Sequence, residues 1–315
     1  MAGEDPIDST AGSKRIASRY VLHPDHELAA QWLVERLESI QGLELERHAF
    51  PVMGEMRENY ILKRLGTEPE LPPVIVGAHY DSIASMEPEG TWLADEDPAP
   101  GADDNASGVV AVLELARLFS QPAYQTKRSI WFTLFTGEEV GLVGSYALAE
   151  SLVEEGQAIR LMISLDPIGF NPADQYRLFY SYDVRTAPDA EVVDQIASIE
   201  DTPLIVTGVD EALMGGDERS DHYPFWAAGF PALHFGNFPL SPNYHTLQDQ
   251  FSDIDMTYLT ATTHLTASIL VEIGEVPEEE RSGVCGTAMV ASWPILLWLP
   301  AMAAIRRRRP VAGSP

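Results

Sequence analysis

The chain has 315 residues, and its 48 Asp and Glu against 20 Lys and Arg give a formal net charge of −28. This charge excludes nucleic acid as a partner, because binding a polyanion requires a basic surface. Hydrophobic residues make up 45 % of the sequence, which excludes global disorder and supplies the core of one large domain or two small ones. The single cysteine, Cys285, excludes an intramolecular disulfide framework and a cysteine-based zinc site. Any metal must therefore be held by histidines and carboxylates.

The N-terminal segment, residues 1–24, shows no apolar region of the kind that marks a signal peptide. Apolar residues at helical spacing then predict a helix over His26–Leu37, with Asp25 as its N-cap. Alternating apolar residues in Leu43–Phe50 and Asn59–Leu65 predict two half-buried strands. The folded domain is therefore expected to begin near residue 25.

Short apolar runs, typical of central strands covered on both faces, follow along the chain. They are Val74–Ala78, Ile130–Phe135 and Leu161–Leu165. Apolar-striped helices are predicted over Gly108–Phe119 and Met256–Ile273. Strands that alternate with helices indicate an α/β fold, specifically a three-layer αβα sandwich around a mixed, largely parallel sheet, over residues 25–275.

Polar side chains follow the predicted strands and precede one predicted helix. They are His79 and Asp81, Asp104, Glu138 and Glu139, Asp166, and, after a run over Pro231–Phe235, Tyr244 and His245. Ligands of open α/β sheets collect at the carboxyl ends of the strands, so these segments deliver histidine or carboxylate to one rim. Each has an ordinary explanation alone: Asp103, Asp104 and Asn105 could merely cap a helix, and a glutamate pair is usually solvated. Their joint occurrence indicates a functional site, while the roles of His222 and His234 stay open.

Six motifs in a fixed order give the chain a family resemblance. They are His79-x-Asp81, the run Gly-Ala-Asp-Asp-Asn-Ala-Ser-Gly at 101–108, Gly-Glu-Glu-x-Gly-x-x-Gly-Ser at 137–145, Asp-Pro-Ile-Gly at 166–169, Ser-Asp-His at 220–222 and Tyr-His-Thr-x-x-Asp at 244–249. In these motifs the chain closely resembles the M28 family of zinc aminopeptidases, over roughly residues 25–275. One departure is Pro167, where relatives often have another residue, and we expect it to stiffen the turn after Asp166.

The resemblance implies a site with two zinc ions and five protein ligands. His79 and Asp166 would hold one ion, Glu139 and His245 the other, and Asp104 would bridge both. Asp81 is suited to fix the His79 imidazole through its other ring nitrogen, and Asp249 to act similarly near His245.

The resemblance also implies catalytic roles for two further residues. Glu138 would be the general base that takes a proton from a metal-bound water and passes it to the leaving amine; on extended backbone it would point away from its neighbour Glu139. Tyr244 would donate to the developing oxyanion or simply pack on the rim of the sheet. The loops Glu87–Gly101 and Gly208–Glu218 are expected to flank the site and shape substrate access.

The function expected from these residues is a two-zinc exopeptidase that releases N-terminal residues from peptides or proteins. A one-zinc glutaminyl cyclase of the same fold is the first alternative, and the residues from Asp104 to Gly108 favour the peptidase. A non-catalytic binding ectodomain is the second alternative, but it would lack ligands that this chain has. A carboxypeptidase is also compatible with the metal centre. No motif indicates the side-chain preference or the oligomeric state.

The C-terminal region is expected to anchor the protein in a membrane. Residues 276–283 read as a linker, and an uncharged apolar span then leads to Arg306–Arg309, with residues 310–315 as a tail. The span is long enough to cross a bilayer core of roughly 30 Å, and the arginines would stay in the cytoplasm. Residues 284–309, with Cys285, resemble a bacterial C-terminal sorting signal of the myxobacterial type; a buried core helix is the alternative. We therefore expect a membrane-anchored or cell-surface protein with its catalytic domain outside the cytoplasm.

Overall fold

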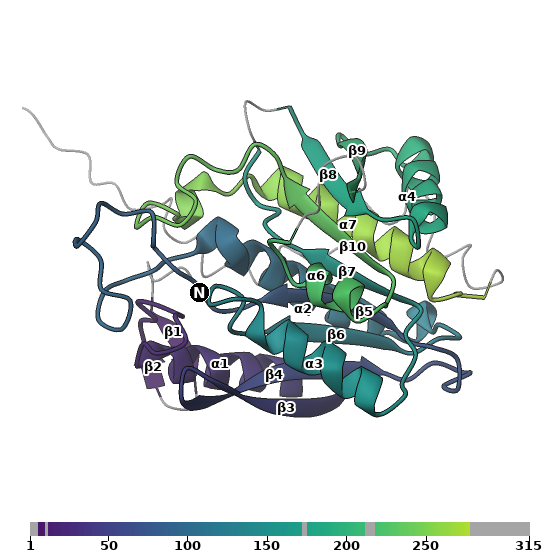
Figure 1. The fold of residues 1–315 in the computed structure, drawn as a ribbon. Helices are drawn as coiled ribbons and strands as arrows, with labels where there is room; N and C mark the ends of the chain where they lie inside the picture. The colour runs from purple at the N-terminus through teal and green to yellow at the C-terminus, as the bar shows by residue number, and fades with distance from the viewer. Residues whose placement is uncertain (1–5, 10–11, 172–174, 212–217, 278–315) are drawn as a thin grey trace, which may run out of the picture. The chain divides into compact units, whose positions relative to one another are not determined.

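The computed structural model describes residues 6–9, 12–171, 175–211 and 218–277 (Figure 1). The described residues up to Val276 pack as one unit. No helix within these ranges is long and apolar enough to cross a membrane. The predicted anchor over residues 284–309, with Cys285, lies outside the described residues.

The centre of the fold is one mixed sheet, which has eight strands among the described residues, in the order β3-β4-β6-β5-β7-β10-β8-β9. Their bounds are β3 Glu44–Val52, β4 Glu55–Arg64, β5 Val74–His79, β6 Ile130–Phe135, β7 Leu161–Leu165, β8 Arg177–Tyr182, β9 Ile205–Asp210 and β10 Ala232–Asn237. The four central strands β6, β5, β7 and β10 are parallel. Antiparallel pairing joins β4 to β3 and β6, and β8 to β10, while β8 and β9 are parallel. The predicted mixed, largely parallel sheet is confirmed.

Helices cover both faces of this sheet, as the predicted three-layer sandwich requires (Figure 1). The helices are α1 Asp25–Glu38, α2 Gly108–Phe119, α3 Val143–Glu154, α4 Ala187–Ile199, α6 His222–Ala227 and α7 Met256–Ile273. On one side α2 packs on β5 and against α7, and on the other side α3 packs against α6, which lies on β7 and β10. Shorter elements are the ribbon β1 Ile7–Ser9 with β2 Gly12–Lys14, and the single turns η1 Ala102–Ser107, η2 Pro122–Tyr124 and η4 Phe251–Asp253.

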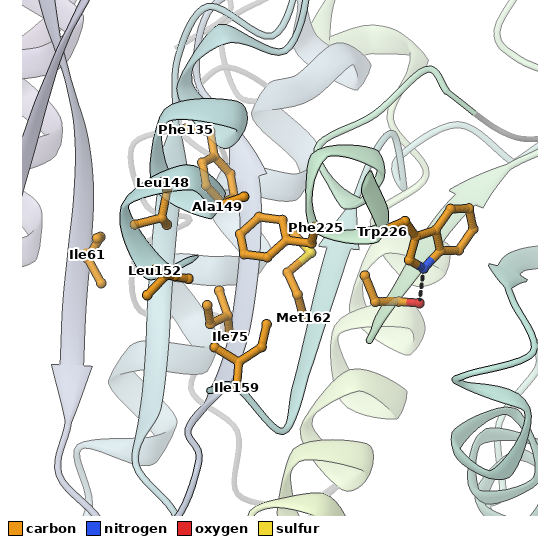
Figure 2. Packing of buried hydrophobic residues seen from close by; sticks show 11 residues of the cluster. Ile61, Ile75, Phe135, Leu148, Ala149, Leu152, Ile159, Met162, Phe225 and Trp226 are labelled. Atoms are coloured by element: carbon orange, nitrogen blue, oxygen red, sulfur yellow. Dashed lines mark hydrogen bonds between the residues drawn. The ribbon is translucent and has the colours of Figure 1, made fainter. Parts of the chain in front are cut away.

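A hydrophobic cluster between the sheet and helices α3 and α6 holds the central strands in place (Figure 2). Ile75 and Met162 contribute from β5 and β7, Leu148 and Leu152 from α3, and Phe225 from α6. Each of these side chains is almost completely buried. Truncating one of them to alanine would cost about 2–5 kcal/mol, because transfer free energy is lost and a cavity is left. This packing fixes the strand ends that carry the polar residues.

The first elements differ from the sequence prediction in detail. Asp25 is the first residue of α1 and not its cap, because its Oδ2 accepts a hydrogen bond from the Ala17 backbone N–H at 2.7 Å. The strand predicted to end at Phe50 continues through Pro51 to Val52. Proline is tolerated there because β3 is the edge strand of the sheet.

The predicted loop Gly208–Glu218 is wrong at its start. Gly208, Val209 and Asp210 belong to β9, the edge strand farthest from β3. Three strands, β7, β10 and β8, separate β9 from the central strand β5. Residues 212–217 lie outside the described residues, so flanking of the site by this segment stays a prediction.

Candidate metal centre

The predicted site residues meet at the rim of the sheet that is formed by the carboxyl ends of its central strands. His79 ends β5, Glu138 and Glu139 follow β6, Asp166 follows β7, His245 lies on the loop after β10, and Asp104 lies in η1 just before α2. They converge because β6, β5, β7 and β10 are adjacent and parallel, so that their carboxyl ends share one rim.

The carboxylate of Asp104 lies between two imidazoles. Its Oδ1 is 3.1 Å from Nε2 of His79, and its Oδ2 is 2.8 Å from Nε2 of His245. A second carboxylate completes each side: Asp166 Oδ1 lies 3.2 Å from His79 Nε2, and Glu139 Oε2 lies 3.0 Å from His245 Nε2. The five side chains therefore form two clusters that share Asp104.

The donor set fits zinc. In each cluster the ligand atoms lie within 4.8 Å of one another. Two donors about 2.05 Å from a tetrahedral zinc ion lie about 3.3 Å apart, which is close to the separations given above. Among the described residues, Oε1 of Glu139 is buried without a hydrogen-bond partner, which leaves a lone pair for a cation. Imidazole nitrogen and carboxylate oxygen are ordinary zinc ligands, so both clusters can each hold an ion.

Protonation of the ligand groups also indicates that a cation belongs here. Burial lowers the pKa of His245, but its hydrogen bonds with Asp104 and Glu139 raise it to about 10. Burial and the nearby Asp104 raise the pKa of Glu139 to about 7. Without a cation, protons must therefore offset the charge of the buried carboxylates. A metal ion would take over that role, because it pairs with the carboxylates directly.

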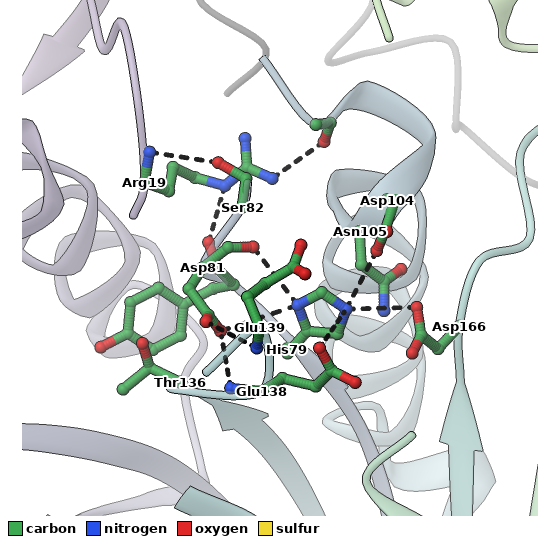
Figure 3. Close-up of polar contacts among 12 residues, drawn as sticks. Arg19, His79, Asp81, Ser82, Asp104, Asn105, Thr136, Glu138, Glu139 and Asp166 are labelled. Atoms are coloured by element: carbon green, nitrogen blue, oxygen red, sulfur yellow. Dashed lines mark hydrogen bonds and ion pairs between the residues drawn. The ribbon is translucent and has the colours of Figure 1, made fainter. Parts of the chain in front are cut away.

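Glu138 reaches toward the His79 side of the site. Its Oε2 is 3.9 Å from His79 Nε2, and burial raises the pKa of Glu138 well above its usual range. The sequence predicted extended backbone at Glu138 and Glu139, and this is wrong. The chain turns here, because the Glu138 carbonyl accepts hydrogen bonds from the N–H groups of Gly141 and Leu142. The side chains of Glu138 and Glu139 leave this turn in different directions around the imidazole (Figure 3).

Two further aspartates hold the backbone of the site. The Asp81 carboxylate lies 3.6 Å from Nδ1 of His79 and accepts hydrogen bonds from the N–H groups of Glu138 and Glu139 at 3.3 and 3.2 Å. Asp249 was expected near His245, but its carboxylate accepts from the N–H groups of Asp103 and Asp104, at 2.8 and 3.0 Å. Asp249 therefore orients the segment that carries Asp104, because the turn η1 packs on the loop that carries Asp249.

Tyr244 stacks on the imidazole of His245, with ring centroids 3.7 Å apart. Burial and the surrounding carboxylates raise the pKa of Tyr244, so its hydroxyl keeps its proton and can donate it in a hydrogen bond. The loop Glu87–Gly101 flanks this side of the site as predicted, since Glu87 Oε1 accepts from the Leu247 N–H at 2.8 Å. Just before it, the Met86 N–H donates to the His245 carbonyl at 2.9 Å.

His234 and His222, whose roles the sequence left open, lie next to the backbone of Asp166 and not among the proposed ligands. Nε2 of His234 is 2.6 Å from the Asp166 carbonyl, and the ring of His222 stacks on His234 with centroids 4.7 Å apart. Pro167 keeps the turn tied to the sheet, because its carbonyl accepts from the Asn237 N–H at 2.9 Å.

Four supporting residues were missed in the sequence. Ser220 donates to Asp166 Oδ2 at 2.7 Å, and Asp103 Oδ1 accepts from the N–H groups of Gly169 and Phe170. Asn59 bridges the two ends of the turn that carries Glu138, and Arg19 binds the backbone beside His79. Most of these partners are more than 50 positions away, so no local pattern marks these residues. The available signals were the Ser-Asp-His motif for Ser220 and the motif at 101–108 for Asp103.

Known proteins resemble this chain in sequence. The sequence profile of peptidase family M28 matches residues 59–270. The chain is 28 % identical over 264 residues to a probable leucine aminopeptidase of Arthroderma otae, covering 78 % of this chain and 65 % of that protein. It is 26 % identical to a probable zinc metalloprotease of Pyrenophora tritici-repentis, covering 71 % of this chain and 58 % of that protein. The chain thus spans somewhat less than two thirds of the length of these relatives.

Solved structures share the fold. The LapA aminopeptidase of Legionella pneumophila superposes with a TM-score of 0.70 at 19 % identity, over 83 % of this chain and 69 % of LapA. A glutaminyl cyclase of Bacteroides thetaiotaomicron superposes with a TM-score of 0.65 at 21 % identity, over 83 % of this chain and 94 % of the cyclase. An aminopeptidase and a cyclase therefore use the same architecture, and the side chains of the site must distinguish the two activities.

Proposed function

Because the chain belongs to peptidase family M28, we propose that it is a two-zinc metallo-exopeptidase that releases N-terminal residues from peptides. One observation carries the proposal: the Asp104 carboxylate lies between His79 and His245, each of which has a second carboxylate at its Nε2. Two dications close together need a shared anion, and Asp104 is in the position to supply it.

The proposed ligands divide between two sides of the site. His79 and Asp166 would hold one zinc ion, and Glu139 and His245 the other, with Asp104 as the shared ligand. Zinc bound there would polarise the scissile carbonyl and lower the pKa of a water molecule.

Glu138 is proposed as the general base and then the general acid. It is not among the five proposed ligands, its Oε2 lies 3.9 Å from His79 Nε2, and burial raises the pKa of its carboxyl, which favours uptake of a proton. It would take the proton from the attacking water and deliver it to the leaving amine. Asp81 would hold Glu138 in place through the Glu138 N–H. The Tyr244 hydroxyl would donate to the carbonyl oxygen as negative charge develops there.

A panel of peptides with free N-termini, blocked N-termini and amidated C-termini, analysed by mass spectrometry, tests the activity. Loss of one N-terminal residue at a time from free and C-terminally amidated peptides, but not from blocked ones, is the expected result. Trimming from the C-terminus would instead show a carboxypeptidase. Loss of ammonia from N-terminal glutamine, with one zinc bound per chain, would show a cyclase.

The variant Glu138→Gln tests the base. We expect it to keep both zinc ions and to lose activity about 10²- to 10⁴-fold, the usual contribution of a positioned acid–base group. Glu150→Gln, on the exposed side of α3, is the matched control and should keep full activity. Full turnover in Glu138→Gln with metal bound would refute the assignment.

We further propose that residues 284–309 anchor the protein in a membrane, with the catalytic domain outside the cytoplasm. Only the apolar span and its following arginines in the sequence support this proposal. Protease added to intact cells should release or degrade the domain. Complete protection, with degradation after lysis, would show that the domain is cytoplasmic.

A further inference from the structure

Arg19, in the segment before α1, is completely buried and binds backbone carbonyls with both arms of its guanidinium. Nε donates to the Tyr80 carbonyl at 2.6 Å, Nη1 to the Pro100 carbonyl at 2.7 Å, and Nη2 to the Gly101 carbonyl at 2.8 Å. Figure 3 shows Arg19 and the hydrogen bonds of its Nε and Nη2. The three acceptors lie on two segments about 20 residues apart in the sequence. One side chain therefore joins these segments.

Both segments carry proposed zinc ligands. Tyr80 lies directly after His79, and Gly101 lies three residues before Asp104. The rigid, planar guanidinium offers donors in fixed directions, whereas a lysine has a single nitrogen on a flexible stem. The distance from His79 to Asp104 is thus linked to the shape of the Arg19 side chain.

Two residues next to Arg19 support this arrangement: Ser82 joins the same two segments, and Gly101 leaves space for the guanidinium. The Arg19 N–H donates to Ser82 Oγ at 3.2 Å, and Ser82 Oγ donates to the Ala99 carbonyl at 2.8 Å, which joins the same two segments a second time. A Cβ on residue 101 would lie 2.8 Å from Arg19 Nη2, so glycine permits the close approach there.

The positive charge of buried Arg19 is balanced by nearby carboxylates. Burial lowers the pKa of Arg19, while Asp249 and Asp81 raise it, and a guanidinium stays charged in either case. These two aspartates are the ones that bind the backbone N–H groups of the ligand-bearing segments. A buried cation is costly unless anions and carbonyl dipoles surround it, and both are present here.

We propose that Arg19 is a positioning residue that sets the spacing of His79 and Asp104 in the metal centre, an inference that rests on the proposed function. Its backbone contacts hold both segments in the arrangement that two ions require. Arg19 lies outside residues 59–270, so the N-terminal segment completes a site whose ligands all come from the part matched by the family profile.

The full-length protein and its variants Arg19→Met and Arg19→Lys test the inference through metal binding. Zinc affinity is measured by competition with a chromophoric chelator, and the Co²⁺-substituted proteins are compared by their visible spectra. We expect Arg19→Met to weaken zinc binding about 10- to 100-fold, as loss of a group that orients ligands does, and to change the Co²⁺ spectrum. Arg19→Lys should lie between Arg19→Met and the wild type.

Arg128→Met is the matched control, because Arg128 is also largely buried and binds Glu275 and the Pro72 carbonyl near the opposite end of β6. It should lower the melting temperature and leave zinc affinity within about twofold of wild type. Wild-type zinc affinity in folded Arg19→Met, or an equal loss in Arg128→Met, would overturn the inference. If Arg19→Met does not fold, unchanged affinity in Arg19→Lys overturns it. Wild-type protein that binds zinc but leaves every peptide intact would instead refute the proposed function alone.

Discussion

The two halves of the candidate metal centre differ in how firmly the fold holds them. His79 and Asp166, the buried half, come directly from the ends of two central strands, and the His79 side chain is 1 % exposed. Glu139 and His245, the loop half, follow a turn and a long loop, and the His245 side chain is 16 % exposed. The sheet itself therefore sets the buried half, while the loop half depends on contacts between loops.

The largest expected difference between the two halves is the loss of stability when the histidine of each half is replaced by alanine. In zinc-free protein, His79 pairs with buried Asp104 and Asp166, which together with Glu138 raise the pKa of His79 well above its ordinary value although burial lowers it. His79→Ala leaves these carboxylates buried without a cation, and we expect a loss of about 3–5 kcal/mol in the free energy of unfolding. His245→Ala should cost less than half of that, because the His245 ring is itself 16 % exposed, so its removal opens Asp104 and Glu139 to water. Urea denaturation of both zinc-free variants measures the difference.

Equal losses in the two variants would contradict the comparison, since they would mean that exposure does not matter at this site. A larger loss in His245→Ala would reverse it. Both variants should also lose peptidase activity, which checks that each histidine contributes to the centre.

Hydrogen bonds behind the ligands allow a finer test. Ser220 Oγ donates to Asp166 Oδ2 at 2.7 Å inside the buried half, whereas Ser85 Oγ lies 3.5 Å from His245 Nδ1 on an exposed loop. We expect Ser220→Ala to weaken zinc binding about 10- to 100-fold and Ser85→Ala to weaken it less than about threefold. Competition with a chelator measures both affinities. A greater effect of Ser85→Ala would show that the loop half is the better ordered one.

The sequence predicted where the residues of the buried half lie, because they follow apolar runs, and their role as metal ligands stays a prediction. The run Val74–Ala78 matches β5, which ends in His79, and the run Leu161–Leu165 coincides with β7, which precedes Asp166. The helix predicted over Gly108–Phe119 is α2. Parallel neighbours then bring the residues after these strands together. In the segment before α2, Asn105 binds the start of the helix, because its Oδ1 accepts a hydrogen bond from the Gly108 N–H. Asp104 lies instead between His79 and His245.

The far side of the sheet was not predicted. In β8 the sequence Arg-Leu-Phe-Tyr-Ser-Tyr has only a short apolar run, and its buried Tyr180 donates a hydrogen bond to Asp194 in α4. The edge strand β9 is only partly buried, so its pattern is weak. Supporting residues such as Asn59 and Arg19 were missed for another reason, since their burial follows from contacts 60 to 85 positions away.

Metal removal should proceed in two steps if the halves differ as described. During dialysis against a chelator, the ion of the loop half should leave roughly tenfold faster, because water reaches His245 and the loop can open. Zinc content followed over time by atomic emission measures the two steps. The variant His245→Ala should lack the fast step and retain the slow one. Release of both ions in a single step, with the same rate in both proteins, would contradict the ordering.

A smaller effect is expected from His26, which supports the buried half from behind. Its ring stacks on Tyr80, the residue after His79, and its Nδ1 lies 2.7 Å from the Arg19 carbonyl. Burial lowers the pKa of His26 to about 4, so the folded protein holds the neutral ring while the unfolded chain titrates near 6.5. Between these values the unfolded state binds more protons, and stability is therefore complete above about pH 6.5 and falls as the pH drops toward 4.

The variant His26→Asn isolates this contribution, because asparagine keeps a donor near the position of Nδ1 and does not titrate. The wild type should lose about 1 kcal/mol per pH unit more than His26→Asn between roughly pH 6.5 and 4.5, which urea unfolding of the zinc-free proteins measures. The carboxylates of the site titrate in both proteins, so their effect cancels in the difference. Parallel pH profiles would show that His26 becomes charged in the folded protein, and hence that water reaches the ring behind the buried half.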